Sequence, residues 1–323
     1  MIRFLLPIIL IPAGIITGYA LQGVLKKKYD TSSVRTGIQK ITLLSLNPIT
    51  FLGAIWIAPL SSVKVLSMPL IGAFSLSFGG LLAFLVALLI HLGRKQRGSF
   101  ITLGAFTNIG SLGGLVVFSL LGEAGFALVP FYKLLEEVMY YGIGFPVARL
   151  HSDTPDAGGR FRLLERMKDP FMIAALSGVS LGLILNLSGI PRPAWYAGLN
   201  GILIPLVSFL LLVSIGMAMK LQNLRRYWHS GLYLMLIKYL LVPAGATFLA
   251  WISELGTIMD GLPLRVVFIL SSMPSGFISL IPPSLYNLDL DYANSCWLIV
   301  MGGLGLALPW IAFAVRFLIP LIP

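Results

Sequence analysis

Long apolar segments separated by short polar loops are the main pattern of this 323-residue chain. A helix needs about 20 mostly apolar residues to cross the hydrocarbon core of a bilayer, and ten segments approach or exceed that length. They cover residues 4–24, 38–59, 67–92, 99–121, 126–149, 170–189, 196–219, 230–252, 264–286 and 293–318. The pattern predicts an all-α integral membrane protein with ten transmembrane helices in contact with the lipid bilayer.

The longest loop divides these ten segments into two groups of five. We therefore expect residues 1–150 and 170–323 to form two five-helix repeats, joined by a basic cytoplasmic connector at 151–169. With five spans per half, the second half begins on the opposite side of the membrane, as in an inverted repeat. Within the connector, segment 160–168 mixes basic and apolar residues, which fits either a helix on the membrane surface or a simple basic linker.

Composition and charge agree with a membrane protein and indicate its orientation. The chain is 57% apolar and 11% charged, whereas soluble domains carry roughly 25% charged residues. The net charge of +11 does not indicate nucleic-acid binding, because sixteen lysines and arginines lie in the odd-numbered loops and only Arg3, Lys64, Arg192 and Arg265 lie on the other side. The positive-inside rule then places both termini outside the cytoplasm. We expect a plasma membrane, or the inner membrane of a bacterium.

The sequence contains little that would support an enzyme or a metal centre. Cys296 is the single cysteine, and the three histidines His91, His151 and His229 lie at or near the ends of apolar segments. No His-Glu-x-x-His segment and no glycine-rich lysine loop for ATP is present, and no aspartate lies within a predicted span. We predict no catalytic activity, no cofactor and no metal.

Two predicted spans, the fourth and the ninth, contain residues that interrupt helices. Glycine costs about 1 kcal/mol relative to alanine in a helix interior, and proline removes a backbone hydrogen bond and clashes with the preceding turn. Residues 106–114 hold an asparagine and three glycines, and residues 271–279 hold a proline among serines. The candidate substrate-binding residues of these two segments are Asn108, Gly110, Ser111, Pro274, Ser275 and Gly276.

Interrupted spans at matching positions of two halves are typical of a transporter site near the bilayer centre. A broken helix exposes N–H groups and a positive dipole end, which favour an anion, while freed carbonyls can hold a cation. A weak internal similarity supports the match, because an offset of 166 residues aligns Asn108 with Pro274 and Gly110 with Gly276. The alternative is that these small residues only allow close helix packing.

Further polar residues lie in other predicted spans. Asn47 and Pro48 interrupt the second span, and Asn200 begins the seventh, so they are candidates to line the same cavity. For Asn47 the alternative is a helix kink with a satisfied amide.

The fifth span holds Lys133, Glu136 and Glu137, and ionisable residues inside a membrane are usually functional. Lys133 can pair with either carboxylate three or four residues away on the helix. We predict an ion-coupling role for these residues. The alternative is a structural ion pair that also involves Lys238.

The fourth span resembles that of the auxin efflux carrier family of membrane permeases. Residues 104–114 read Gly-Ala-Phe-Thr-Asn-Ile-Gly-Ser-Leu-Gly-Gly, close to the family pattern Asn-x-Gly-x-x-Gly-x-Pro, with Leu115 in place of the proline. The segments 204–217 and 272–275 are similar to parts of the family's seventh and ninth spans. Related bile-acid and arsenite permeases share the architecture, and the missing proline puts the geometry of the first crossing segment in question.

The resemblance implies a secondary transporter for small organic anions such as carboxylates. It implies a scaffold domain, a transport domain with elevator-type alternating access, and the fourth and ninth spans crossing at the substrate. Some family members form homodimers, which makes a homodimer one expectation here. The coupling ion is left open between a proton and sodium, the latter as in bile-acid symporters. A channel or a membrane sensor is the alternative of another class.

Overall fold

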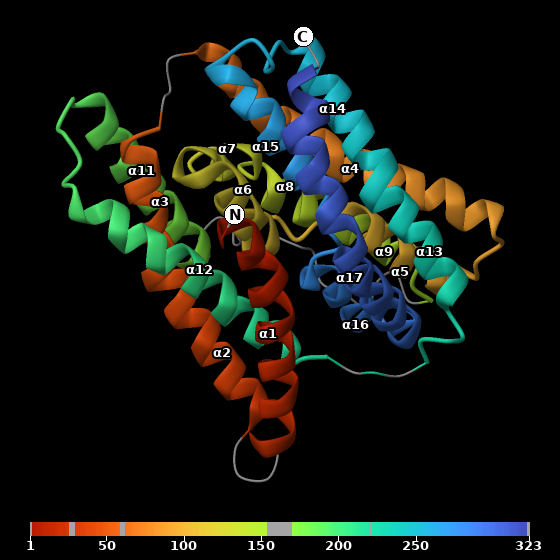
Figure 1. Cartoon of the computed structure of the whole chain (residues 1–323). Helices are drawn as coiled ribbons and strands as arrows, with labels where there is room; N and C mark the ends of the chain where they lie inside the picture. The colour runs from red at the N-terminus through yellow and green to blue at the C-terminus, as the bar shows by residue number, and fades with distance from the viewer. Residues whose placement is uncertain are drawn as a thin grey trace. The chain divides into compact units, whose positions relative to one another are not determined.

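The computed structural model describes residues 2–25, 30–58, 62–153, 170–219, 221 and 223–321 (Figure 1). Over these residues all regular structure is helical, apart from one isolated β-bridge between Thr107 and Ser275. Seven helical segments in this part of the chain are long and apolar enough to cross a membrane, as expected of a helical membrane protein. Most of the predicted connector, including segment 160–168, lies outside the described residues.

The chain divides into two compact units that do not coincide with the two halves of the sequence. Unit 1 consists of Met1–Ser61, Gly110–Pro130 and Leu164–Met219. Unit 2 consists of Ser62–Ile109, Phe131–Leu163 and Lys220–Pro323. Each unit therefore takes helices from both predicted repeats.

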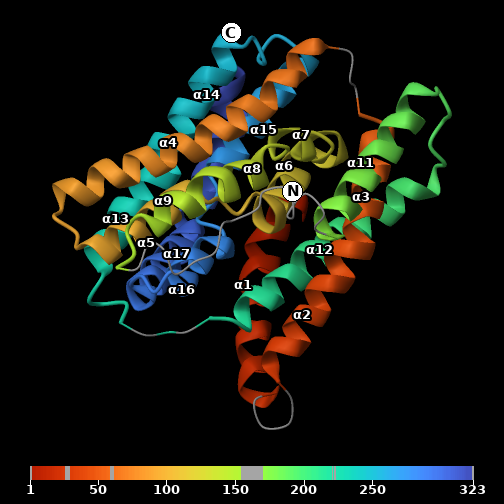
Figure 2. The same cartoon turned by 180° about the vertical axis from the view of Figure 1, so that it is seen from behind.

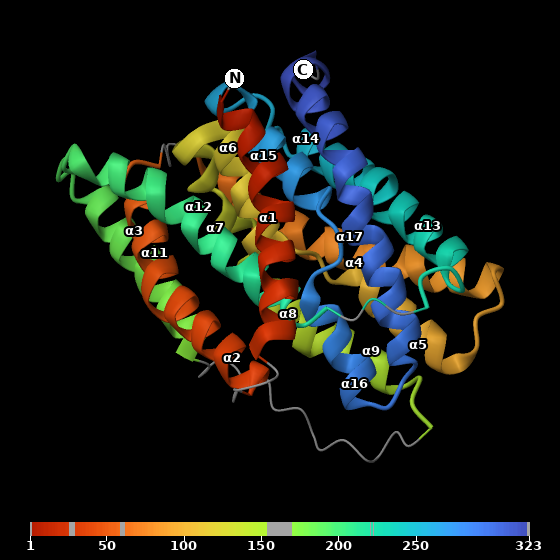
Figure 3. The same cartoon turned by 60° about the horizontal axis from the view of Figure 1, so that its bottom comes forward.

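Unit 1 is built on two pairs of packed helices. Helix α1 (Ile2–Leu25) lies against α12 (Trp195–Gly216), as Figure 3 shows, and α3 (Asn47–Trp56) lies against α11 (Pro170–Leu187). Glycines permit these contacts: a Cβ atom on Gly18 would come within 2.1 Å of the Val213 carbonyl oxygen, and one on Gly178 within 2.4 Å of the Pro48 carbonyl oxygen. Such close backbone approach through small residues is typical of helices packed in membranes.

Two further helical segments complete unit 1. Helix α2 (Thr31–Ile41) continues through the π-helical turn η1 (Thr42–Leu46) into α3, and α6 (Gly114–Phe126) contacts α1, α3 and α12. Asp30 caps α2 by accepting hydrogen bonds from the backbone N–H groups of Ser32 and Ser33. Their hydroxyls also donate to its carboxylate, and these bonds lower the pKa of Asp30 to about 2.

Unit 2 is centred on α4 (Met68–Leu89), which packs against α5 (Arg94–Ala105) and α14 (Val242–Ile252), as seen in Figure 2. Helix α17 (Leu290–Phe313) lies along α13 (Trp228–Leu236), and α14 also contacts α15 (Leu262–Ser271). Shorter turns extend these helices: η2 (Val63–Ser67), η5 (Ile237–Leu241), η6 (Met259–Gly261), η8 (Ala314–Leu318) and η9 (Ile319–Leu321).

Three of the ten predicted spans are divided into short helical pieces, and a fourth, α11, is short. The predicted fourth span consists of α5, the π-helical turn η3 (Ile109–Gly113) and α6. The predicted ninth span consists of α15, η7 (Phe277–Leu280) and α16 (Ile281–Leu285). The predicted fifth span consists of α7 (Val129–Tyr132), α8 (Glu136–Met139), η4 (Tyr140–Gly144) and α9 (Phe145–Arg149).

The interruption of the predicted fourth span lies earlier than its glycines suggest. Helix α5 ends at Ala105, residues 106–108 are not helical, and Gly110, Gly113 and Gly114 belong to the helical turns that follow. These three glycines therefore lie just after the break and not in it. The break is instead held open by backbone hydrogen bonds to a distant segment, which are described below.

Candidate functional site

The two interrupted helices cross in unit 2 through a short antiparallel backbone contact. Thr107 faces Ser275 in the β-bridge. On either side of it, the Asn108 N–H donates to the Pro274 carbonyl at 2.8 Å and the Gly276 N–H donates to the Phe106 carbonyl at 3.0 Å. We call residues 106–108 and 274–276 the crossover. The aligned positions Asn108 and Pro274 thus meet directly.

Side chains of the crossover itself and of α17 satisfy other polar groups that the two breaks release. The last carbonyls of a helix have no partner within it. Here the Ser275 hydroxyl donates to the Leu103 carbonyl at 2.6 Å, and the Trp297 indole N–H donates to the Ser275 carbonyl at 2.9 Å. Gly276 suits the close approach, because a Cβ atom there would lie 3.0 Å from the Thr107 carbonyl oxygen. The crossover is thus a defined structure and not a loose loop.

Tyr140 forms hydrogen bonds with the backbone groups of Thr107 that take no part in the bridge. In an antiparallel pair of this type, residues 106 and 108 make the ladder bonds, so the backbone groups of Thr107 point away from Ser275. The Tyr140 hydroxyl accepts from the Thr107 N–H at 3.2 Å and lies 2.9 Å from the Thr107 carbonyl oxygen. Tyr140 and Thr107 are both buried.

A lysine from η5 reaches the same residue from another direction. The side chain of Lys238 is 0% exposed, and its ammonium donates to the Thr107 hydroxyl and, at 3.4 Å, to the Gly104 carbonyl at the end of α5. No carboxylate of the described residues forms a salt bridge with this ammonium. The alternative that Lys238 joins a structural ion pair with Glu136 is therefore not supported.

The ionisable residues predicted in the fifth span lie beside the crossover. The Lys133 ammonium is 3.2 Å from Glu136 Oε2, and the Tyr140 hydroxyl is 2.6 Å from Glu136 Oε1. The Glu136 side chain is 7% exposed and that of Lys133 is 29% exposed, so the pair extends from the interior towards the surface of unit 2. Glu137, the third ionisable residue predicted in this span, is half-buried.

The other predicted site residues are distributed as follows. Asn108, Pro274, Ser275 and Gly276 come together at the crossover, and Gly110 and Ser111 follow it directly in η3. Asn47 and Pro48 begin α3 in unit 1, where the Asn47 carbonyl accepts from the Thr50 hydroxyl and Pro48 packs on α11. Their predicted place in the substrate cavity stays a prediction.

A buried polar cluster in unit 1 was not predicted from the sequence. The Arg192 guanidinium forms a bidentate ion pair with Glu123, and its Nη1 also donates to the Gly53 carbonyl at 2.8 Å. Asn200 is fully buried and donates to Glu123 at 2.6 Å and to the Thr50 carbonyl at 3.2 Å. One feature of the sequence could have indicated this cluster. Glu123 and Arg192 are isolated charges in loops that are predicted to lie on the same side of the membrane.

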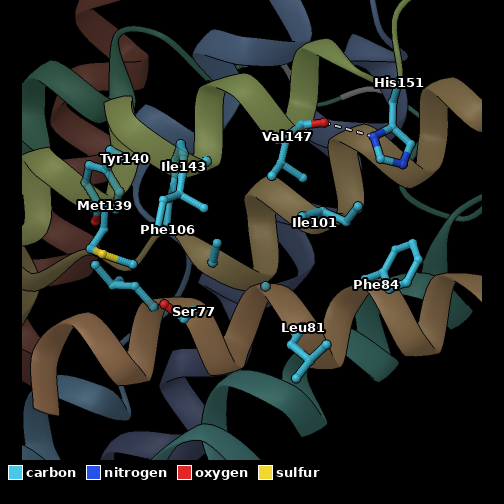
Figure 4. A pocket seen from close by; sticks show the side chains of 14 residues that line it. Ser77, Leu81, Phe84, Ile101, Phe106, Met139, Tyr140, Ile143, Val147 and His151 are labelled. Carbon is cyan, nitrogen blue, oxygen red and sulfur yellow. Dashed lines mark hydrogen bonds between the residues drawn. The ribbon is translucent and has the colours of Figure 1, made fainter. Parts of the chain in front are cut away.

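An apolar cavity of about 350 Å³ adjoins the crossover within unit 2. Figure 4 shows Phe106 and Tyr140 together at one end of it and His151, bonded to the Val147 carbonyl at 3.0 Å, at the other. Its remaining wall consists mainly of aliphatic side chains from α4, α5, η4 and α9. Such a cavity suits a hydrocarbon group rather than a solvated ion.

No family model and no curated protein sequence matches the chain.

Proposed function

We propose that the protein is a secondary active transporter for a small organic anion, a carboxylate being the first choice. The observation that carries this proposal is the crossover, where two interrupted helices pair through extended backbone. At membrane depth, irregular backbone is tolerated only where protein surrounds it or where it lines a water-filled cavity. Interrupted helices of this kind form the substrate sites of many secondary transporters.

A ten-span topology with inverted repeats is part of the proposal. Unit 1 contains the first, second, sixth and seventh predicted spans and parts of the fourth and fifth. Unit 2 contains the third, the eighth to tenth and the rest of the fourth and fifth. In the proposed repeats the first span corresponds to the sixth and the second span to the seventh, so unit 1 contains two corresponding pairs. The resemblance to auxin efflux carriers remains the model for this arrangement, and two compact units are what an elevator mechanism requires. A plasma-membrane location and a homodimer are proposed on the same resemblance.

Lys238 supports an anionic substrate. Its ammonium is fully buried beside the crossover, and its bonds there are to an uncharged hydroxyl and a carbonyl. A buried charge without a counter-charge is costly, so an anion bound near Thr107 would be strongly stabilised. The adjoining apolar cavity favours an organic anion over an inorganic one.

Uptake into liposomes tests the proposal. We expect the reconstituted protein to accumulate a radiolabelled carboxylate under an imposed proton gradient, with no change when choline replaces sodium. A requirement for sodium would favour a symporter of the bile-acid type, and single-channel currents would favour a channel. Absence of flux for every carboxylate tried, with folded protein, would contradict the proposal.

Variants at the crossover test the location of the site. A carboxylate that binds is expected to raise the unfolding temperature of the protein. In Asn108→Ala and Pro274→Ala, at least ten times more carboxylate should be needed for the same rise. Gly302→Ala is a matched control, because an added Cβ at this α17 glycine meets nothing within 4 Å. Unchanged ligand binding in both crossover variants would place the substrate elsewhere.

A further inference from the structure

The hydroxyl of Tyr140 has three polar neighbours but only one proton. It lies 2.6 Å from Glu136 Oε1, 2.9 Å from the Thr107 carbonyl oxygen and 3.2 Å from the Thr107 backbone nitrogen. A phenol donates one hydrogen bond and accepts others. The Thr107 N–H supplies its own proton, so the hydroxyl must choose between two oxygen atoms as acceptors.

The protonation state of Glu136 decides that choice. When Glu136 is a carboxylic acid, its O–H donates to Tyr140, and the Tyr140 O–H donates to the Thr107 carbonyl, so every group is satisfied. When Glu136 is a carboxylate it only accepts, so the Tyr140 proton turns to Glu136 and the Thr107 carbonyl loses its donor. A buried carbonyl without a partner is destabilising. The crossover backbone is therefore more tightly held when Glu136 carries a proton.

Lys133 acts in the opposite direction. Its ammonium is 3.2 Å from Glu136 Oε2 and forms an ion pair with the carboxylate. Other ionisable groups near Glu136 are the neighbouring Glu137 and the buried Tyr132, whose hydroxyl is 2.7 Å from that of Ser75 on α4. Helix α4, which packs against α8, carries no charged side chain. Glu136 thus has one charged partner towards the surface and one neutral partner towards the crossover.

We propose that Glu136 is a proton-binding site and that Tyr140 transmits its occupancy to the crossover at Thr107. On deprotonation the proton leaves Glu136 for water, and the Tyr140 O–H rotates from the Thr107 carbonyl to Glu136 Oε1. Tyr140 remains neutral throughout and acts as a positioning residue. The effect reaches Lys238 as well, because its ammonium holds the Thr107 hydroxyl. This inference rests on the proposed transport function only where it concerns coupling to flux.

The surroundings of the Tyr140 ring suit it to transmit a change at Glu136 to Thr107. In Figure 4 its ring lies beside Phe106 at the end of the apolar cavity, with the two ring centres 4.3 Å apart. The ring is thus fixed by packing, while its hydroxyl is free to turn its single proton. Rotation about the C–O bond is sufficient and requires no movement of the helix.

The test uses the full-length protein in lipid nanodiscs without any substrate. Infrared difference spectra between acidic and alkaline buffer should contain the band of a protonated carboxyl group, which Glu136→Gln removes and Glu137→Gln leaves. Amide exchange in the peptide containing Thr107, corrected for the intrinsic effect of pH, should be slower in the protonated state. In Glu136→Gln, whose amide donates to Tyr140 permanently, that exchange should stay slow at all pH values.

Tyr140→Phe separates proton binding from its transmission. The Glu136 band should persist, whereas the pH dependence of exchange at Thr107 should be lost; Tyr141→Phe is the matched control and should behave as the native protein. If Tyr140→Phe does not fold, Glu136→Asp, whose carboxyl falls short of Tyr140, serves the same purpose. Equal pH dependence of exchange in the native protein and Glu136→Gln would overturn the inference.

Flux measurements distinguish this inference from the proposed function. If the infrared and exchange signals behave as expected but no carboxylate is transported, proton binding at Glu136 stands and the transporter proposal fails. If carboxylate flux occurs and Glu136→Gln retains the full stimulation by a proton gradient, the transporter proposal stands and Glu136 is not its coupling site.

Discussion

At the scale of single residues, Glu123 and Arg192 form a buried ion pair in unit 1. The two side chains are 15% and 8% exposed, and Nη2 of Arg192 lies 3.0 Å from Glu123 Oε2. The guanidinium also lies over the Tyr196 ring, 5.8 Å from its centre. Paired and hydrogen-bonded in this way, both charges are compensated, whereas either one alone would not be.

Removing one partner of this pair should destabilise unit 1. We expect Arg192→Gln to lower the free energy of unfolding by about 3–5 kcal/mol, because Glu123 is left as a buried, uncompensated charge. Thermal unfolding in detergent measures the effect. Glu254→Gln is the control, since its partner Lys64 lies 2.6 Å away at an exposed site where ion pairs contribute little. Similar unfolding temperatures for the two variants would contradict this interpretation.

At the scale of elements, the contact between α4 and α5 sets the position of the crossover. The two helices approach so closely that a Cβ atom on Gly79 would lie 2.3 Å from the Gly104 carbonyl oxygen, and one on Gly104 would lie 2.4 Å from the Ala83 Cβ. The same Gly104 carbonyl accepts from Lys238, and α5 ends one residue later. The end of α5 is thus fixed by helix packing and by a buried cation together.

Gly79→Ala should therefore disturb the crossover through the backbone of α5. Because the added methyl group meets a carbonyl oxygen and not a flexible side chain, α5 must shift, and overpacking of this kind costs about 1–3 kcal/mol. Thermal unfolding and amide exchange of residues 104–108 report on it. The control Gly302→Ala adds the same methyl group in open space and should be neutral or stabilising by up to about 1 kcal/mol. If Gly79→Ala and Gly302→Ala had the same unfolding temperature and the same amide exchange at residues 104–108, the proposed clash would be ruled out.

Sequence patterns predicted the helices and the crossing segments better than the contacts around them. Hydrophobic segments located the helices, and Asn108 and Pro274 marked segments that are indeed interrupted. Pro282 and Pro283 also look like breaks, but they lie in the first turn of α16, where a missing N–H costs little. The partnership of Tyr140 with Thr107 depends on tertiary packing across 33 residues, which no local periodicity encodes.

At the scale of the whole molecule, contacts between loops bear on the topology. Lys64 pairs with Glu254, and both belong to even-numbered loops of the proposed ten-span arrangement; Lys95 pairs with Asp153, and both belong to odd-numbered loops. Loops that meet must lie on the same side of a membrane. The two ion pairs are therefore compatible with the orientation that the positive-inside rule predicts.

Cysteine labelling can test this orientation directly in a Cys296→Ser background. We expect a membrane-impermeant maleimide to label Thr257→Cys on intact cells, because its loop is proposed to face outwards and the residue is exposed. Asp153→Cys, also exposed, should be labelled only after the membrane is permeabilised. Labelling of both from outside would contradict the ten-span arrangement.

The distance along the chain between the two crossing segments has a consequence for biosynthesis. Thr107 finds its bridge partner Ser275 only after most of the polypeptide has left the ribosome. Until then the Asn108 N–H and the Phe106 carbonyl lack the partners that they have in the folded protein, and unpaired polar groups are costly in lipid. The crossover is thus a late step of folding. Nascent chains that stop before residue 271 would leave these two backbone groups without their bridge partners.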